Sequence, residues 1–386
     1  MSGRSGRSGK RRQDGPGRPS RSRQQQHTQR GVQSAYEGPR EPPEQPTVRG
    51  WEDTRDFYSA LKIFVNETTR RNVKELVNEY TELNAMPRPE TSPEFTRHMD
   101  CNRYRDVICA EQGRVRLDNG RYIHANWITA LGEQRFICTQ GPLETTCADF
   151  WTMLHFNNHL QLKISMNKFQ VLRKQFLNLA VSVSSFGDNT PEENIESIVM
   201  LCDTVEQNKT KCHQYWPTPD KKQLHFANKM ITVQFIEETA LEPDLYRTKL
   251  AVLSRNGTMY VHHFHWRRWP DRGVPQNDLA PLRLLFHVQQ FRRSVVHCSA
   301  GIGRTGTLVA LHIAYDTLQR GQRLNILALA RNLRQHRAQS VQTLDQYLYI
   351  YFVILRYAQN KAAKLNIDER ALTTFLREMD ERMTRS

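Results

Sequence analysis

The segment Val295–Thr307 has the composition of a phosphate-binding loop built around a nucleophile. Two β-branched residues end a predicted strand, Cys298 follows, three glycines surround Arg304, and an apolar helical run begins at Leu308. A strand, a glycine-rich turn and a helix N-terminus together direct backbone N–H groups at a bound anion. The guanidinium of Arg304 is shaped to donate to two phosphate oxygens, and this positive environment favours the thiolate of Cys298. The segment therefore predicts phosphoryl transfer through a covalent cysteinyl-phosphate intermediate.

The same residues fit two other interpretations less well. A lone cysteine in an apolar stretch is usually a small buried hydrophobic residue, but glycine, arginine and threonine at fixed offsets have no packing reason to accompany it. The phosphate loop of nucleotide-binding proteins ends in Gly-Lys-Ser/Thr, whereas this loop reads Gly303-Arg304-Thr305. Because Arg304 and the backbone amides already supply positive charge, we expect neither a metal ion nor another cofactor.

The run His297–Gly306 resembles the signature loop, His-Cys-x5-Arg, of the phosphotyrosine-specific branch of the protein tyrosine phosphatases. The resemblance implies a single α/β domain, in which a twisted mixed β-sheet is flanked by helices and the cysteine loop joins a strand to a helix. It also implies that Cys298 is the nucleophile, that Arg304 holds the phosphate, and that Thr305 eases the departure of the sulfur. The loop residues that would surround the phosphate, with His297 in support, are Ser299, Ala300, Gly301, Ile302 and Gly303.

A short distance upstream, Trp269-Pro270-Asp271 has the composition of a mobile loop. Trp269 provides an apolar anchor, Pro270 stiffens the backbone, and Gly273 permits a hinge. The family carries its acid loop at this place. The resemblance therefore implies that Asp271 protonates the leaving tyrosine oxygen and later accepts a proton from water. Taken alone, Pro-Asp would be a surface turn.

A polar segment around Gln342 precedes an apolar run with helical spacing, and Ser340 or Thr343 is suited to cap that helix. The resemblance implies that Gln342 orients the water that hydrolyses the phosphocysteine, with Gln346 assisting. Side-chain amides suit this role because they both donate and accept hydrogen bonds. Without the cysteine loop, the segment would be an ordinary polar helix start.

The segment Asn102–Val107 resembles the phosphotyrosine-recognition loop of the family. The ring of Tyr104 is suited to stack on a substrate phenyl ring and to make the pocket too deep for phosphoserine. The resemblance further implies that Asp106 accepts hydrogen bonds from the substrate backbone and that Arg105 attracts acidic residues beside the phosphorylated tyrosine. The alternative for Tyr104 is ordinary packing.

Glu206 and Lys211 match supporting positions of the family, Glu206 as a bidentate partner of Arg304 and Lys211 beside the acid loop. The chain departs from the family in the region Tyr122–Ile128, where His124 stands at a position that usually holds asparagine. We expect this replacement to alter a hydrogen bond behind the tyrosine loop.

Apolar residues at helical spacing form two stripes, over 57–65 and 73–83, and each stripe predicts a helix. The same spacing predicts an amphipathic helix over 364–380. The middle of the chain is instead rich in strand-forming residues. The strands predicted there are Tyr122–Ile128, Ile198–Cys202, Met230–Ile236, Tyr246–Leu253 and Met259–Trp266.

The expected organisation is a disordered basic tail over 1–48, a catalytic domain over 50–360 and a helical tail over 361–386. Residues 1–50 carry 11 Lys and Arg against 4 Asp and Glu, a net +7 of the chain's +15. This segment has too few apolar residues to offset chain entropy. Its basic clusters suit acidic partners, namely nucleic acid, acidic lipid or an import receptor that would give a nuclear location. No aromatic residues are interleaved to favour nucleic acid, and a solvated tail without a partner is the alternative.

The stretch Thr152–Ser197, 46 residues long, separates two core elements that follow each other closely in the family. Three interpretations stay open: a surface insertion with its own helix, a regulatory or partner-binding segment, and translated non-coding sequence from a faulty gene prediction. Recovery of peptides around Gln170–Arg173 from the natural protein by mass spectrometry would exclude the third.

The seven cysteines stand singly, without the paired spacing of a disulfide framework or a zinc site. A reactive thiolate also needs a reducing compartment. Neither a signal peptide nor an apolar run of about 20 residues is visible. We therefore expect a cytoplasmic signalling hydrolase that acts on tyrosine-phosphorylated proteins and does not span a membrane.

Two alternatives to an active tyrosine phosphatase fit the sequence less well. A catalytically weak phosphotyrosine-binding pseudophosphatase would usually have lost the cysteine, the arginine or the acid, and all three are present. His124 and the insertion are the two features that favour this alternative. A dual-specificity phosphatase would lack the deep pocket that Tyr104 predicts.

Overall fold

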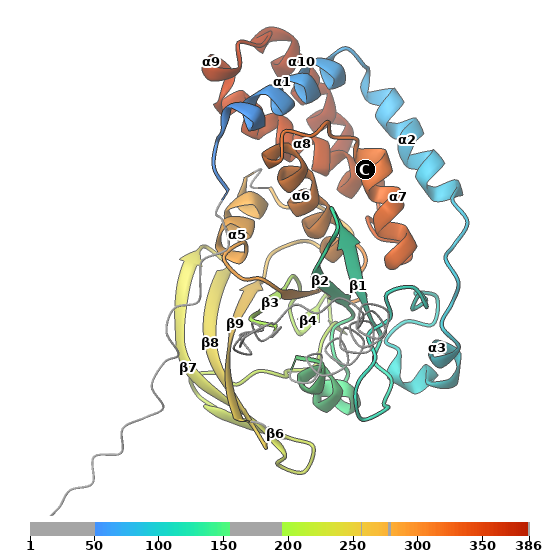
Figure 1. The fold of residues 1–386 in the computed structure, drawn as a ribbon, viewed down its shortest axis with the longest axis vertical. Coiled ribbons are helices and arrows are strands. Elements are labelled where there is room, and N and C mark those ends of the chain that lie inside the picture. The colour runs from blue at the N-terminus through green and yellow to red at the C-terminus, as the bar shows by residue number, and fades with distance from the viewer. Residues whose placement is uncertain (1–50, 155–194, 256, 277–278, 385–386) are drawn as a thin grey trace, which may run out of the picture. The chain divides into compact units, whose positions relative to one another are not determined.

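The computed structural model describes the chain in four stretches, residues 51–154, 195–255, 257–276 and 279–384 (Figure 1). The basic tail predicted to be disordered over 1–48 lies outside these residues.

The interior of the stretch Thr152–Ser197 also lies outside the described residues, but both of its ends are described. A helix covers residues 147–154, and Ser197 is the first residue of strand β3. Leu154 and Ile195 are both buried in the main hydrophobic core. The two flanks of the stretch are therefore core elements.

Within the described chain, eight strands form one mixed sheet in the order β1-β2-β10-β3-β9-β8-β7-β6. Strand β10 pairs in parallel with β2 and β3, and β3 pairs in parallel with β9, whereas the remaining pairs are antiparallel. A separate hairpin consists of β4 (Val205–Glu206) and β5 (Lys209–Thr210). The mixed sheet with flanking helices confirms the predicted fold class. The strands of the sheet are β1 (Ala125–Ala130), β2 (Glu133–Thr139), β3 (Ser197–Met200), β6 (Gln223–Phe226), β7 (Ile231–Glu242), β8 (Leu245–Ser254), β9 (Gly257–Trp266) and β10 (Ser294–His297).

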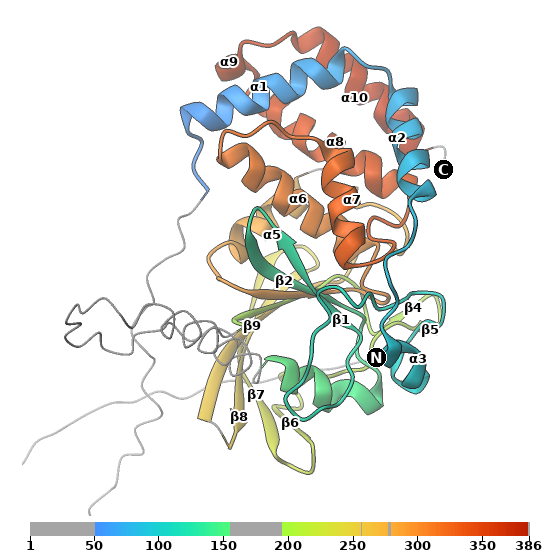
Figure 2. The same ribbon diagram turned by 45° about the vertical axis from the view of Figure 1, so that its right-hand side comes forward.

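Most of the helices build up in layers on one side of this sheet, whereas α3 and the helix over residues 147–154 lie apart from these layers (Figures 1 and 2). Helix α6 lies against β10 and β2, α1 and α8 pack on α6, and α10 packs on α8. The helices are α1 (Arg55–Thr69), α2 (Val73–Ala85), α3 (Pro93–Arg97), α5 (Ala280–Val288), α6 (Arg304–Gln319), α7 (Ile326–His336), α8 (Leu344–Asn360), α9 (Ala362–Leu365) and α10 (Glu369–Thr384).

Strand β10 and helix α6 carry the cysteine loop between them. All four residues of β10 are buried between β2 and β3, which explains the uninterrupted apolar pair Val295-Val296. Helix α6 is buried on nearly its whole circumference because the sheet and helices α1, α5, α7 and α8 surround it. Both ends of the loop are thus anchored in the core.

Helices α1 and α2 confirm the two apolar stripes, and side-chain caps explain where they begin. Thr54 accepts a hydrogen bond from the N–H of Phe57 at the start of α1, and Asn72 and Glu75 form a capping box at the start of α2. Thr343 caps α8 in the same way, so it and not Ser340 is the cap of that helix.

The predicted strand Tyr122–Ile128 is wrong at its start, since β1 begins only at Ala125. The side chains of Tyr122 and His124 are buried behind the site and bonded there; the hydroxyl of Tyr122 donates to Asn102 at 2.9 Å.

The single helix predicted over 364–380 is in fact two helices. Asn366 adopts a left-handed conformation, with φ of 48°, and ends α9 after Leu365. Asp368 then accepts hydrogen bonds from two backbone N–H groups and starts α10. The apolar side of α10 lies in the same core as α8 through Leu372, Phe375, Leu376 and Met379.

Candidate active site

The thiol of Cys298 lies at the base of a loop whose peptide groups surround it. The N–H of Gly301 donates to the Cys298 sulfur at 3.2 Å. Gly301 has a φ of 71°, and a Cβ at this position would lie 2.0 Å from the carbonyl oxygen of Thr139. Only glycine therefore lets the loop approach strand β2 this closely.

Burial raises the pKa of the Cys298 thiol, but its neighbours outweigh this effect and the net shift is downward. The Arg304 cation contributes most, followed by Thr305 and the N–H of Gly301. The hydroxyl of Thr305 is buried and makes no hydrogen bond of ordinary geometry to the described residues, so it is free to turn toward the sulfur. The site favours the thiolate.

The guanidinium of Arg304 is buried and held by three groups. Its Nη1 and Nη2 donate to the two carboxylate oxygens of Glu206 at 2.6 and 3.0 Å, the bidentate pair expected from the sequence. Nη1 also donates to the carbonyl oxygen of Trp269 at 2.9 Å, and Nη2 donates to Asp271 at 3.1 Å. The arginine is thereby fixed beside Cys298 with its charge retained.

The carboxylate of Asp271 lies between two cations. One oxygen accepts from Nζ of Lys211 at 2.6 Å, and the other accepts from Arg304. Burial raises the pKa of Asp271, but Lys211 and Arg304 outweigh burial and lower it overall. The buried indole of Trp269 donates to the carbonyl oxygen of Gly273 at 3.1 Å and closes the acid loop on itself. The acid loop is thus docked against the arginine of the cysteine loop.

Gln342 and Gln346 both lie against the cysteine loop at Gly303. A Cβ on that glycine would lie 2.9 Å from Oε1 of Gln342 and 3.1 Å from the amide of Gln346. Oε1 of Gln346 accepts from the N–H of Gln342 at 3.0 Å, and its Nε2 donates to the carbonyl oxygen of Gly273 at 3.4 Å. The buried, β-branched Val341 has a φ of 61°, a strained backbone that sets the direction of the next side chain.

Tyr104 is joined directly to the cysteine loop. Its hydroxyl lies 2.8 Å from Oγ of Ser299, which donates its own proton to the carbonyl oxygen of Lys211 at 3.0 Å. The Tyr104 hydroxyl is therefore the donor to Ser299. Arg105 and Asp106 follow in the chain and are exposed.

His297 supports the cysteine loop from the core. Burial lowers the pKa of His297 to about 3, so its ring is neutral. Its Nδ1 donates to the carbonyl oxygen of Cys298 at 3.1 Å, and its Nε2 accepts from the hydroxyl of Tyr215 at 2.7 Å. Nε2 of His263 lies 2.8 Å from the same hydroxyl, so the two histidines are joined through Tyr215.

The structure also assembles residues that the sequence analysis did not single out. Arg103 donates to the carbonyl oxygens of Gly141 and Pro142 at 2.9 and 2.7 Å, which holds the tyrosine loop against the segment after β2. Arg337 is buried behind the cysteine loop and donates to two of its carbonyl oxygens. Only three-dimensional contacts give these two arginines a role, because their partners are backbone carbonyl oxygens.

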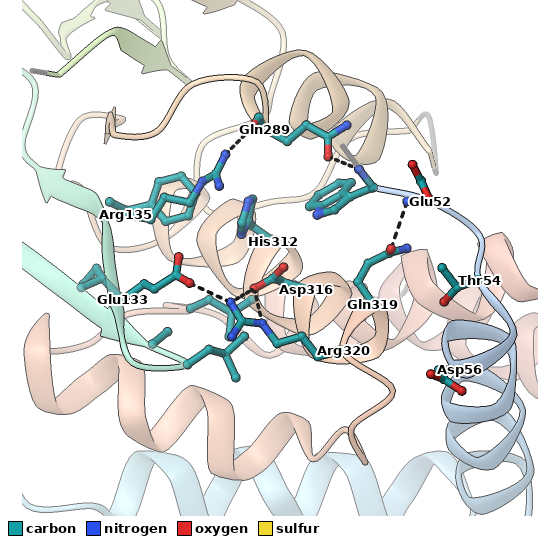
Figure 3. A pocket seen from close by; sticks show the side chains of 16 residues that line it. Glu52, Thr54, Asp56, Glu133, Arg135, Gln289, His312, Asp316, Gln319 and Arg320 are labelled. Carbon is teal, nitrogen blue, oxygen red and sulfur yellow. Dashed lines mark hydrogen bonds and ion pairs between the residues drawn. The ribbon is translucent and has the colours of Figure 1, made fainter. Parts of the chain in front are cut away.

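A cavity of about 580 Å³ shares no lining residue with the cysteine loop (Figure 3). It lies between the start of α1, the turn joining β1 to β2, and α6. On one of its sides Arg320 pairs with Glu133 and Asp316 at 3.1 and 3.2 Å, as Figure 3 shows. None of the residues assigned to the site from the sequence lies in this cavity.

The sequence profile described as protein-tyrosine phosphatase matches residues 98–175 and 179–356, which is more than half of the chain. The chain belongs to the protein-tyrosine phosphatase family. This membership confirms the resemblance that the cysteine loop indicated.

The chain is similar to curated tyrosine-protein phosphatases named as non-receptor types and to others named as receptor types. Mouse tyrosine-protein phosphatase non-receptor type 2 is 29% identical over 296 residues, which cover 73% of this chain and 63% of that protein. The human type 2 protein is 30% identical over 282 residues, covering 70% of this chain and 59% of that one. The chain thus spans about three fifths of the length of these relatives.

Solved phosphatase domains share the fold. The catalytic domain of human protein tyrosine phosphatase non-receptor type 18 superposes with a TM-score of 0.58 at 25% identity, over 76% of this chain and 99% of that domain. The type 18 protein in complex with HER2 phospho-peptides gives a TM-score of 0.61 at 23% identity, covering 76% and 98%.

Within the described residues, no helix of this phosphatase family member is long and apolar enough to cross a membrane. In the same part of the chain, no three His, Cys, Asp or Glu side chains are grouped closely enough to hold a metal ion.

Proposed function

We propose that the chain is an active protein tyrosine phosphatase that hydrolyses phosphotyrosine in proteins through a cysteinyl-phosphate intermediate. The observation that carries this proposal is the cluster of Cys298, Arg304 and Asp271. It places a thiol of lowered pKa, a fixed bidentate cation and a candidate proton donor within one site.

In the first step, the Cys298 sulfur attacks the phosphorus and the bond to the tyrosine oxygen breaks. Arg304 and the N–H groups of the cysteine loop hold the equatorial oxygens, where charge increases. Asp271, when protonated, gives its proton to the leaving tyrosine oxygen.

In the second step, water attacks the phosphorus of the phosphocysteine and the thiolate leaves. The amide of Gln342 lies beside Gly303 of the cysteine loop, which supports its role in orienting that water. Asp271 accepts the proton of the water, and the Thr305 hydroxyl stabilises the departing sulfur of Cys298. Phosphate and the free enzyme result.

Substrate binding must change the ionisation of Asp271. In the free protein its carboxylate is bound to Lys211 and Arg304, and its pKa is lowered. A substrate phosphate competes for Arg304 and brings negative charge close to the carboxylate. Both effects raise the pKa of Asp271, so phosphate binding favours the protonated acid that the first step needs.

The preference for phosphotyrosine is proposed to come from Tyr104. Its hydroxyl is tied to Ser299, so the ring is fixed at a set distance from the cysteine loop. A phenyl ring stacked on Tyr104 would place its phosphate at Cys298, and the shorter phosphoserine would not reach the sulfur. Arg105 and Asp106 are proposed to contact the substrate chain beside the phosphotyrosine.

We further propose a cytoplasmic location, no cofactor, and a catalytic domain over residues 50–360 followed by a helical segment over 361–386. The basic residues 1–48 are proposed to contact acidic partners.

The remaining alternative is a pseudophosphatase that binds phosphotyrosine without turnover, and His124 together with the 152–197 stretch is what favours it. Hydrolysis of a chromogenic aryl phosphate, inhibited by vanadate and lost in Cys298→Ser, would support an active enzyme. Full activity of purified Cys298→Ser, or phosphopeptide binding with no turnover, would reject it.

A further inference from the structure

His124 is buried between two loops of the site. Its Nε2 lies 2.9 Å from the carbonyl oxygen of Val107, and its Nδ1 lies 2.8 Å from Nη1 of Arg337. A carbonyl oxygen only accepts hydrogen bonds, and a guanidinium only donates them. A single tautomer satisfies both contacts, with the proton on Nε2 and a free lone pair on Nδ1. Burial, followed by the charge of Arg337, lowers the pKa of His124 to about 3, which keeps the ring neutral.

The guanidinium of Arg337 is buried, and its four hydrogen bonds all end on neutral acceptors. Nη2 donates to Ala300 and Nε to Gly301, both at their carbonyl oxygens, over 3.0 and 3.1 Å. Nη1 donates to the Asn126 side chain at 2.9 Å and to His124. Because no charged partner among the described residues fixes it, the position of the guanidinium depends on the geometry of these acceptors.

The contact of Arg337 with Ala300 sets the direction of an amide that faces the nucleophile. In a trans peptide the C=O and N–H groups point in opposite directions. Arg337 holds the C=O of Ala300, so the N–H of the same peptide, that of Gly301, points the other way. That N–H is the donor to the Cys298 sulfur at 3.2 Å.

We propose that His124 is a positioning residue that sets the Cys298 thiolate through Arg337 and the substrate tyrosine pocket through Val107. Its two ring nitrogens serve the two effects separately, since Nδ1 faces the cysteine loop and Nε2 faces the loop that carries Tyr104. For catalysis, the role rests on the proposed phosphatase activity.

Two conservative variants separate the two nitrogens. In His124→Asn, the amide oxygen takes the place of Nδ1 and accepts from Arg337, but the side chain is too short to reach Val107. In His124→Gln, the amide nitrogen takes the place of Nε2 and donates to Val107, while Arg337 loses an acceptor.

For His124→Gln we expect the pH profile of Cys298 alkylation by iodoacetamide to move to higher pH. We also expect kcat/KM for a small aryl phosphate to fall roughly tenfold, equivalent to about 1.4 kcal/mol. For His124→Asn we expect the alkylation profile to stay near that of the unmodified chain. KM should rise several-fold for the aryl phosphate and for a phosphotyrosine peptide, because both place a phenyl ring in the pocket of Tyr104. Thermal unfolding verifies that each variant is folded.

Equal changes in the two variants would overturn the proposal, because a merely structural role predicts them. An unshifted alkylation profile in His124→Gln would overturn it as well.

A second test needs no variant and is made on the full chain. The ¹⁵N chemical shifts of the His124 ring at neutral pH should report a neutral imidazole protonated on Nε2. A ring protonated on Nδ1, or on both nitrogens, contradicts the proposed contacts. Alkylation and ring shifts do not depend on turnover. If the chain fails to hydrolyse phosphotyrosine, the proposed function is rejected. The alkylation profiles and the ring shifts would still test the positioning role of His124.

Discussion

At the scale of single residues, the proposed chemistry depends on Arg304. It lowers the pKa of Cys298, is held by both oxygens of Glu206, and is also bound by Asp271, the proposed acid. Substrate phosphate must therefore displace one carboxylate, that of Asp271, while the other keeps the guanidinium in place.

The pH dependence of Cys298 tests the first of these contacts. Its pKa is lowered, so alkylation by iodoacetamide should be fast at neutral pH and should slow as the pH falls through the lowered value. In Arg304→Met the inflection should move to higher pH, because the largest favourable charge is gone. Arg304→Lys is the matched control that retains a charge, and its inflection should lie between the two. An inflection that is identical in all three proteins would mean that Arg304 does not set the thiolate.

Replacement of Asp271 should separate binding from turnover. Asp271→Ala loses the general acid, which typically contributes about 10²- to 10⁴-fold, so kcat should fall by that order. The same change frees Arg304 and Lys211 for an anion, so vanadate should bind more tightly than to the unmodified chain. Isothermal titration with vanadate measures this directly. Weaker vanadate binding in Asp271→Ala would show that the carboxylate does not compete with the anion.

At the scale of elements, the cysteine loop is held by the strand and helix that flank it and by close backbone contact with β2. The Gly301 position is the tightest point, with a Cβ site 2.0 Å from the carbonyl oxygen of Thr139. Gly132 offers a matched comparison, since its φ of 82° is similar but a Cβ there would meet nothing within 4 Å.

Gly301→Ala and Gly132→Ala should therefore differ sharply in stability. We expect Gly132→Ala to cost about 1–2 kcal/mol for the left-handed conformation alone. Gly301→Ala should cost about 2–5 kcal/mol, because overpacking is added to that strain. Urea unfolding gives both values, and similar losses in the two variants would contradict the close approach to Thr139.

The sequence predicts which loops carry the reactive side chains better than it predicts the contacts that hold those loops together. The cysteine loop, the acid loop and the glutamine segment are each visible as short runs with typical residues, because each needs glycine, proline or amide side chains at fixed positions. Arg337 and Arg103 carry no such local signal, since their partners are carbonyl oxygens that any residue supplies. The break at Asn366 has no local signal of this kind, because Leu365 and Leu372 are seven residues apart, the spacing of one helix face, although a left-handed residue lies between them.

At the scale of the whole molecule, helix α10 contributes to the main hydrophobic core, which also contains Cys298. Leu372 of α10 is fully buried against the helices that pack on α6, whereas Arg377 on the same helix is exposed. Leu372→Ala should lower the free energy of unfolding by about 2–5 kcal/mol through the cavity it leaves. Arg377→Ala should change it by less than about 0.5 kcal/mol. Chemical denaturation tests this, and equal stability of the two variants would place α10 outside the cooperative core.

The order of the strands in the sheet could be predicted only from the resemblance to the family. Strand β10 lies between β2 and β3, which come from distant parts of the chain, and no local pattern in Val295-Val296 indicates its neighbours. The mixed sheet follows once family membership is known. The contacts of His124 do not, because its partners, the carbonyl oxygen of Val107 and the guanidinium of Arg337, carry no local signal in the sequence.

The central claim, that Cys298 carries the phosphoryl group during turnover, is tested most directly by trapping the intermediate. Gln342→Ala should slow the second step and leave the first intact. Rapid acid quenching during hydrolysis of a phosphotyrosine peptide, followed by peptide mass spectrometry, should then find one phosphoryl group on Cys298. Turnover without any phosphorylated Cys298 peptide, or a phosphoryl group on another residue, would contradict the account.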